Sequence, residues 1–239
     1  MAIAWTELDH GNSATDAATI SSGVVAFTPA TDRVFVAILV HSKGTAADAP
    51  SAPTGASGTW TIQHQSAGTS GSLKRITVYK CIDATGSEAV TWDFGGTNQT
   101  GFIWYILQGD GVDNGGTQGA DAFVQTILDN NSSADVELTN TFAQAYGAAN
   151  GALYIAEVND TSPNFVEEDG FTALTGETCS APAMSVTVAW MATNPASTTI
   201  SVGSDSNQGM FRAYEIKAAD VGGVAGTSTS NRTTRRRRR

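Results

Sequence analysis

Along most of the chain, runs of β-branched and aromatic residues alternate with clusters of Gly, Asn, Asp and Ser. This pattern is typical of short β-strands joined by turns. The clearest stretch spans residues 73–107 and holds three such runs, at 73–82, 89–94 and 102–107. Three strands separated only by short turns predict a β-meander, in which each strand pairs with the next one.

The same order of runs returns about 110 residues later. The Asn98-Gln99 pair is matched by Asn207-Gln208, and Tyr105 is matched by Tyr214 at the same offset of 109. The three later runs are 184–191, 198–202 and 210–216; further upstream, 152–158 corresponds to 34–40 and 171–174 corresponds to 60–62. We interpret this as an internal duplication, with halves at about 15–112 and 123–219.

Each half supplies about six strands, and twelve strands are too many for one flat sheet. The predicted fold is therefore all-β: a jelly-roll-like β-sandwich built from two internally repeated six-strand halves, with a body at 1–221. In the run 102–107 the apolar residues occupy both alternating faces, so each face needs a cover. This favours one merged body, with two tandem sandwiches as the alternative.

The C-terminal segment 222–239 has no strand pattern and reads as a flexible Gly/Ser/Thr linker followed by a basic tail. Six of the 13 basic residues lie in it: Arg232, Arg235, Arg236, Arg237, Arg238 and Arg239. Without them, seven basic residues face 23 acidic ones, a net charge of about −16. We expect these arginines to bind a partner. The favoured partner is an acidic groove on a neighbouring subunit, and the alternatives are nucleic acid or no specific role.

Signals for catalysis are weak. The histidines His10, His41 and His64 have no partners at metal-binding or catalytic spacing. The acidic trio at 167–169 has the character of a solvated loop, and no GxSxG motif is present. We therefore expect a protein that is not an enzyme. Cys81 and Cys179 are expected to be packed free thiols.

Two weaker ligand sites were considered. Asp110, Asp113 and Asn114 resemble a calcium loop in bringing oxygen ligands and glycines together, although the full EF-hand spacing is missing. Tryptophans on strands could stack on sugar rings, and Trp92 beside Asp93 is the best candidate. No apolar run approaches the roughly 20 residues of a membrane span, so no membrane partner is expected.

Several motifs along residues 15–218 resemble tailed-bacteriophage structural proteins. They are Thr15-Asp16, Phe27-Thr28-Pro29 before the apolar run 34–40, Thr59-Trp60-Thr61, the run 76–80 and the run 90–94. Proteins of this type are minor tail, head-fibre or capsid decoration components, so the resemblance implies a role on the virion surface. It transfers no site residues, and the arginine tail is not part of the pattern.

The leading hypothesis is therefore a non-enzymatic structural protein of a bacteriophage particle, assembled in the host cytoplasm. It would be a head decoration or a tail- or fibre-associated component. The arginine tail would anchor it to other virion proteins or to further copies of itself. The alternatives are a carbohydrate-binding module for host adsorption, and a capsid shell protein whose basic tail faces the genome.

Overall fold

The computed structural model describes residues 2–43, 47–67, 73–131, 136–162, 164–193, 197–204 and 208–220. Within these ranges the fold is all-β, as predicted, and the short 3-10 helix Ala120–Ala122 is the one helical element. We call the residues before this helix the N-terminal half and those after it the C-terminal half.

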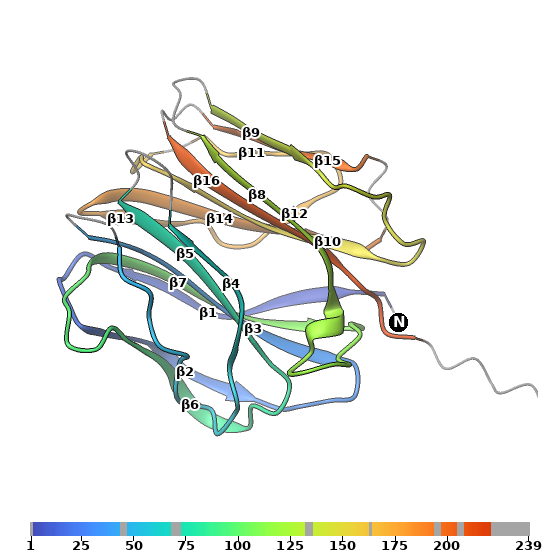
Figure 1. Ribbon diagram of the computed structural model, residues 1–239, viewed down its shortest axis with the longest axis horizontal. Coiled ribbons are helices and arrows are strands. Elements are labelled where there is room, and N and C mark those ends of the chain that lie inside the picture. Colours follow the sequence, from blue (N-terminus) through green and yellow to red (C-terminus); the bar gives the residue numbers. More distant parts are fainter. Residues whose placement is uncertain are drawn as a thin grey trace, which may run out of the picture.

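Two large antiparallel sheets form the middle of the molecule (Figure 1). The N-terminal sheet has the order β1 (Ala4–Ser13), β7 (Thr100–Asp110), β3 (Arg33–Ser42), β5 (Lys74–Cys81) and β4 (Thr61–Ala67). The C-terminal sheet has the order β12 (Thr172–Ala173), β14 (Ala183–Met191), β10 (Gly151–Val158), β16 (Gly209–Ile216) and β8 (Phe123–Asn131), and β13 (Glu177–Ser180) also pairs with β14.

Two smaller antiparallel sheets cover the outside. One pairs β2 (Thr19–Phe27) with β6 (Gly86–Asp93). The other has the order β11 (Val166–Glu167), β15 (Thr199–Ser204) and β9 (Val136–Thr141). The four sheets lie as four layers, with the β2–β6 pair and the β9–β15 sheet on opposite outer sides (Figure 1).

Strand β3 shows why the layers stack. Successive side chains point to opposite faces of a strand, and every apolar residue from 34 to 40 is buried. Val36 and Ile38 face the core between the two large sheets, whereas Leu39 faces the core beneath β2 and β6. Strand β10 repeats this, with Ile155 in the central core and Tyr154 in the core beneath β9 and β15.

The central core mixes both halves of the chain. Val36, Ile38 and Tyr105 of the N-terminal sheet belong to the same buried cluster as Ile155 and Val188 of the C-terminal sheet. Each large sheet is therefore covered on one face by the other half of the chain, and on its other face by its own small sheet.

The predicted meander is wrong. Strand β6 does not pair with β5 or β7; it crosses to the outer layer and pairs with β2, so that β5 and β7 both flank β3. The burial pattern gives the reason. In β6 only alternate residues such as Val90 and Trp92 are buried, which suits an outer layer, whereas β5 and β7 are buried on both faces.

A further difference concerns strand β8, which was not predicted, because Gln125, Thr126 and Asp129 dilute its apolar pattern. Strand β1 lies at the edge of its sheet. Cys81 and Cys179 are both buried free thiols, as predicted.

Candidate functional site

The residues predicted to bind a partner, Arg232, Arg235, Arg236, Arg237, Arg238 and Arg239, lie outside the described residues. Their role therefore stays a prediction. The last described residues are tied down, because the Ala219 backbone N–H donates to the Gly111 carbonyl and Lys217 donates to Asp113.

Trp92 cannot stack on a glycan, so this prediction is corrected. Its side chain is fully buried in the core between the N-terminal sheet and the β2–β6 pair. Alternation along β6 turns Val90 and Trp92 inward, and a large aromatic side chain gains most from being out of water. Trp60 is also buried, at 4% exposure.

The three residues that resemble a calcium loop are paired with other protein groups. Asp110 accepts from Arg33 Nε at 2.6 Å, Asp113 is paired with Lys217, and Asn114 donates to the Ala30 carbonyl at 3.1 Å. The hydrogen bond from Lys217 holds the pKa of Asp113 below its usual value. These groups therefore pair with two protein cations and a backbone carbonyl. Within the described residues, no group of three or more His, Cys, Asp or Glu is placed to hold a metal ion.

The remaining candidates for catalysis are tied into the framework. His41 is fully buried, and its Nε2 lies 2.8 Å from the Asp48 carbonyl oxygen. Burial lowers the pKa of His41 to about 4. In the acidic trio, Glu168 accepts from the Ser201 backbone N–H at 2.9 Å. These side chains hold neighbouring segments in place.

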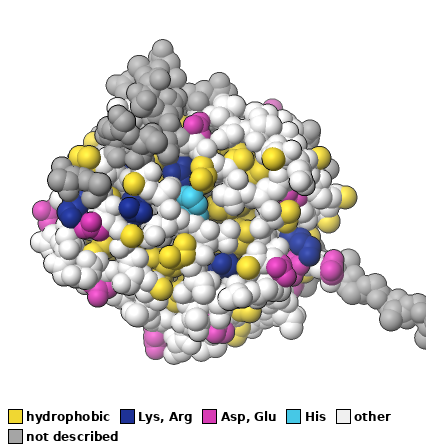
Figure 2. Space-filling model, viewed as in Figure 1, with side chains coloured by type: hydrophobic (Ala, Val, Ile, Leu, Met, Phe, Trp, Pro, Cys, Tyr) yellow, Lys and Arg dark blue, Asp and Glu magenta, His cyan; other side chains and the backbone are white. Residues whose placement is uncertain are grey.

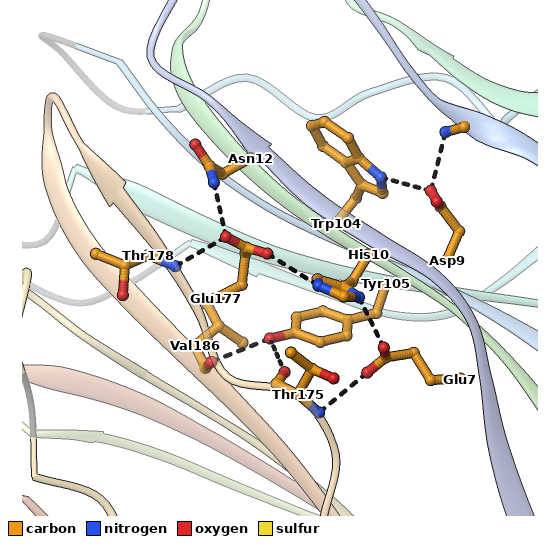
Figure 3. A network of polar contacts seen from close by, with 11 residues as sticks. Glu7, Asp9, His10, Asn12, Trp104, Tyr105, Thr175, Glu177, Thr178 and Val186 are labelled. Atoms are coloured by element: carbon orange, nitrogen blue, oxygen red, sulfur yellow. Dashed lines mark hydrogen bonds and ion pairs between the residues drawn. The ribbon is translucent and has the colours of Figure 1, made fainter.

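The most connected polar cluster on the described residues lies where β1 meets the C-terminal half (Figure 3). We call it the β1 seam; it comprises Glu7, His10, Asn12, Tyr105, Thr175, Glu177 and Thr178. His10 lies between two carboxylates, with Nδ1 2.7 Å from Glu7 and Nε2 3.4 Å from Glu177. The imidazole ring is stacked over Tyr105, with ring centroids 6.1 Å apart.

Each carboxylate of the β1 seam also accepts a hydrogen bond from the opposite half. Glu7 accepts from the Thr175 backbone N–H at 3.1 Å, and Glu177 accepts from Asn12 Nδ2 at 2.6 Å. Tyr105 adds a third link, because its hydroxyl lies 2.9 Å from the Thr175 carbonyl oxygen and 3.1 Å from that of Val186. Burial and the nearby Glu177 and Glu7 raise the pKa of Tyr105 well above its ordinary value. The hydroxyl therefore stays protonated, and the cluster holds the N-terminal and C-terminal halves together.

A second seam joins the halves at β4, on the opposite edge of the N-terminal sheet. We call it the β4 seam; it comprises His64, Ser66 and Arg212. Arg212 Nε of β16 donates to His64 Nε2 at 3.2 Å and to Ser66 Oγ at 3.0 Å. Arg212 is fully buried, and its Nη1 donates to the Asp129 carbonyl at 2.8 Å. Burial and the guanidinium charge lower the pKa of His64 to about 4.

Between the seams, an ion pair crosses the central core. Lys74 Nζ of β5 lies 2.8 Å from Glu157 of β10 and also donates to the Ala183 carbonyl at 2.7 Å. The side chains of Lys74 and Glu157 are 5% and 0% exposed. Burial raises the pKa of Glu157 even though Lys74 acts in the opposite direction. We did not predict this pair; its signal was the charge of Glu157 inside β10, a strand that is otherwise apolar.

On the face drawn in Figure 2, acidic and basic side chains lie scattered among uncharged groups. An open hollow of about 240 Å³ lies beside Glu177. The hydroxyls of Thr178 and Ser185 in its wall lie 2.9 Å apart and are hydrogen-bonded to each other.

Comparison of the chain with protein-family models, with curated proteins and with solved structures finds no match. Among the described residues, no helix has the length and apolarity needed to cross a membrane.

Proposed function

We propose that this chain is a structural component of a tailed-bacteriophage particle, located on the head or tail surface. The observation that carries the proposal is the central core that both halves build together. Together with two polar seams and a buried ion pair, it makes the body one unit in which neither large sheet can separate without exposing apolar surface. Such a body suits a structural role, in which the protein acts through its shape and through the surface that it presents to its neighbours. The motifs that resemble phage structural proteins supply the context.

We further propose that the body is a duplicated jelly-roll-like unit. The strand order supports this. In the N-terminal half, β1-β7-β3-β5 forms one sheet while β2 pairs with β6; in the C-terminal half, β8-β16-β10-β14 forms one sheet while β9 pairs with β15. If β11 and β13 are treated as additions, equivalent strands take equivalent places. Alternation of strands between two facing sheets is the arrangement of a double-sheet jelly roll.

The arginine tail would supply attachment. Residues 221–239 follow the last described residue, and Gly/Ser-rich linkers of 19 residues in general have a root-mean-square end-to-end distance of roughly 25 Å. That is close to the diameter of a small domain, so the tail can reach a neighbouring subunit. Guanidinium groups form paired hydrogen bonds with carboxylates, and the acidic balance of the chain makes a second copy a suitable acceptor.

Mass spectrometry and immunogold labelling of particles purified from the natural host system test the proposal. We expect the chain in the particles, with gold on their surface. Absence from purified particles would refute the proposal.

Replacing Arg232 and residues 235–239 by Gln should abolish incorporation while the circular dichroism of the body stays unchanged. The matched control replaces the same residues by Lys, which keeps the charge and loses the paired geometry. DNA binding that falls steeply with salt, and that disappears in the Gln variant, would instead favour the capsid-shell alternative with a genome-facing tail.

A further inference from the structure

The β4 seam holds its histidine in a geometry that requires a neutral ring. Two donors point at His64 Nε2: Arg212 Nε–H at 3.2 Å and the Ser66 hydroxyl at 2.9 Å. Both need the lone pair on Nε2, so the ring carries its proton on Nδ1. A second proton on Nε2 would place an N–H opposite the Arg212 N–H, and it would add a positive charge beside a buried guanidinium.

The strands packed around His64 provide few free negative groups that could balance that positive charge. The charged groups on them are Arg212 and Glu215 on β16, Lys74, Arg75 and Lys80 on β5, Glu157 on β10 and Asp129 on β8. Glu215 is engaged by Asn150 Nδ2 at 2.6 Å. Glu157 is engaged by Lys74, and Lys80 is itself buried. The balance near the ring is therefore positive. Because β4 pairs with β5 alone and β8 pairs with β16 alone, the two strands at this side of the molecule are sheet edges.

The β1 seam has the opposite geometry. There both ring nitrogens of His10 face carboxylate oxygens, of Glu7 and Glu177. A ring that is protonated on both nitrogens donates to both carboxylates. The contacts of this seam therefore do not require a neutral ring, whereas those of the β4 seam do.

We propose that the body is an acid-operated hinge, in which protonation of His64 opens the β4 seam while the β1 seam stays closed. The inference does not rest on the proposed virion role, since it concerns the body alone. In the closed seam the pKa of His64 is about 4, and in the open seam it returns to its ordinary value of 6.5. The equilibrium constant for opening therefore rises about tenfold for each pH unit of acidification between these two values. The total increase between these limits is up to about 300-fold.

Hydrogen exchange of the full chain, followed by mass spectrometry from pH 7 to pH 4.5, tests the hinge. Rates are divided by the intrinsic rate at each pH, so that only protection is compared. We expect protection in β4 and β8 to fall at least tenfold more than protection in β1 and β13, which reports the loss of stability of the whole body. Equal loss in all four strands, or no change in β4 and β8, would overturn the proposal.

Two variants isolate His64. In His64→Gln, which accepts a hydrogen bond and cannot take the charge, the loss of protection in β4 should disappear. The matched control is His41→Gln, which removes the other buried histidine of lowered pKa and should leave the acid response of β4 intact. His64→Lys should open the seam at pH 7. A His64→Gln variant that still loses β4 protection in acid would refute the role of this ring.

Discussion

The two seams join the same two sheets, yet they are built from opposite chemistry. At the β1 seam a partly exposed histidine, 32% accessible, lies between carboxylates of both halves. At the β4 seam a histidine lies against a fully buried guanidinium. The comparison teaches that the charges around a histidine, more than the fold around it, decide whether its contacts require a neutral ring.

Between the seams, the Lys74–Glu157 pair should give the largest effect. The variant Glu157→Gln leaves the Lys74 charge buried without its counterion, which costs about 3–5 kcal/mol of unfolding free energy. The double variant Lys74→Met with Glu157→Leu should recover most of that loss, because both charges of the pair are removed together. Urea unfolding measures both. A single variant as stable as the double one would contradict a charge-based cause.

The second prediction concerns pH. Above pH 6.5 His41 is neutral in the folded and the unfolded chain, so it contributes nothing. Below pH 6.5 the unfolded chain binds a proton that the folded chain, with a pKa of about 4, does not. Stability therefore falls as pH decreases from 6.5 to 4, by about 3 kcal/mol in total for this fully buried ring.

His64 adds a loss of the same sign, reduced by its partial contact with solvent. Urea midpoints at pH 7 and pH 4.5 measure the combined effect. The variants His41→Gln and His64→Gln should each remove part of the acid loss, and the double variant should remove more than either one. An unchanged slope in the double variant would argue against both histidines.

A smaller effect is expected at the β1 seam. Glu177→Gln removes the charge facing His10 but keeps an oxygen for Asn12 Nδ2 to donate to. Because the group is within reach of solvent, the loss should be about 0.5–1.5 kcal/mol. Comparison with Glu157→Gln, the same substitution in the core, shows how much burial increases the loss of unfolding free energy. Equal losses at both positions would contradict this account.

The smallest effect is expected from the tail. Deleting residues 232–239 should change the unfolding free energy of the body by less than about 0.5 kcal/mol, since surface changes outside the core seldom do more. Urea unfolding of the truncated and full chains checks this. A large loss would mean that the tail is part of the folded body and not an attachment device.

Much of the fold could be predicted from local pattern. The runs near 34–40, 76–80 and 152–158 are strands in the structure, because several β-branched residues in a row suit an extended backbone wherever it packs. The pairing of these strands could not be predicted the same way. Alternation in the 89–94 run predicted a strand. Its position in the outer layer beside β2 depends on which apolar faces of the other strands have to be buried, and the sequence does not show this.

The candidate sites were harder to predict than the fold. Trp92 was a candidate for sugar binding because a tryptophan on a strand looks the same in sequence whether it faces solvent or core. The β1 seam brings together Glu7 and Glu177, which are 170 positions apart, and neither has a neighbour in sequence that hints at the contact. Of the residues in the β4 seam, His64 was noticed as a histidine, and its partner Arg212 was not.

The amino-acid sequence by itself determined that this protein is all-β, rich in turns, acidic in its body and basic at its end. Those properties follow from composition and from alternation over a few residues, which act locally. Only the tertiary structure decided which face of each sheet meets the other half, and which charges lie buried there. The reason is that burial and charge pairing depend on distances between strands far apart in the chain, and these distances exist only once all four layers have packed.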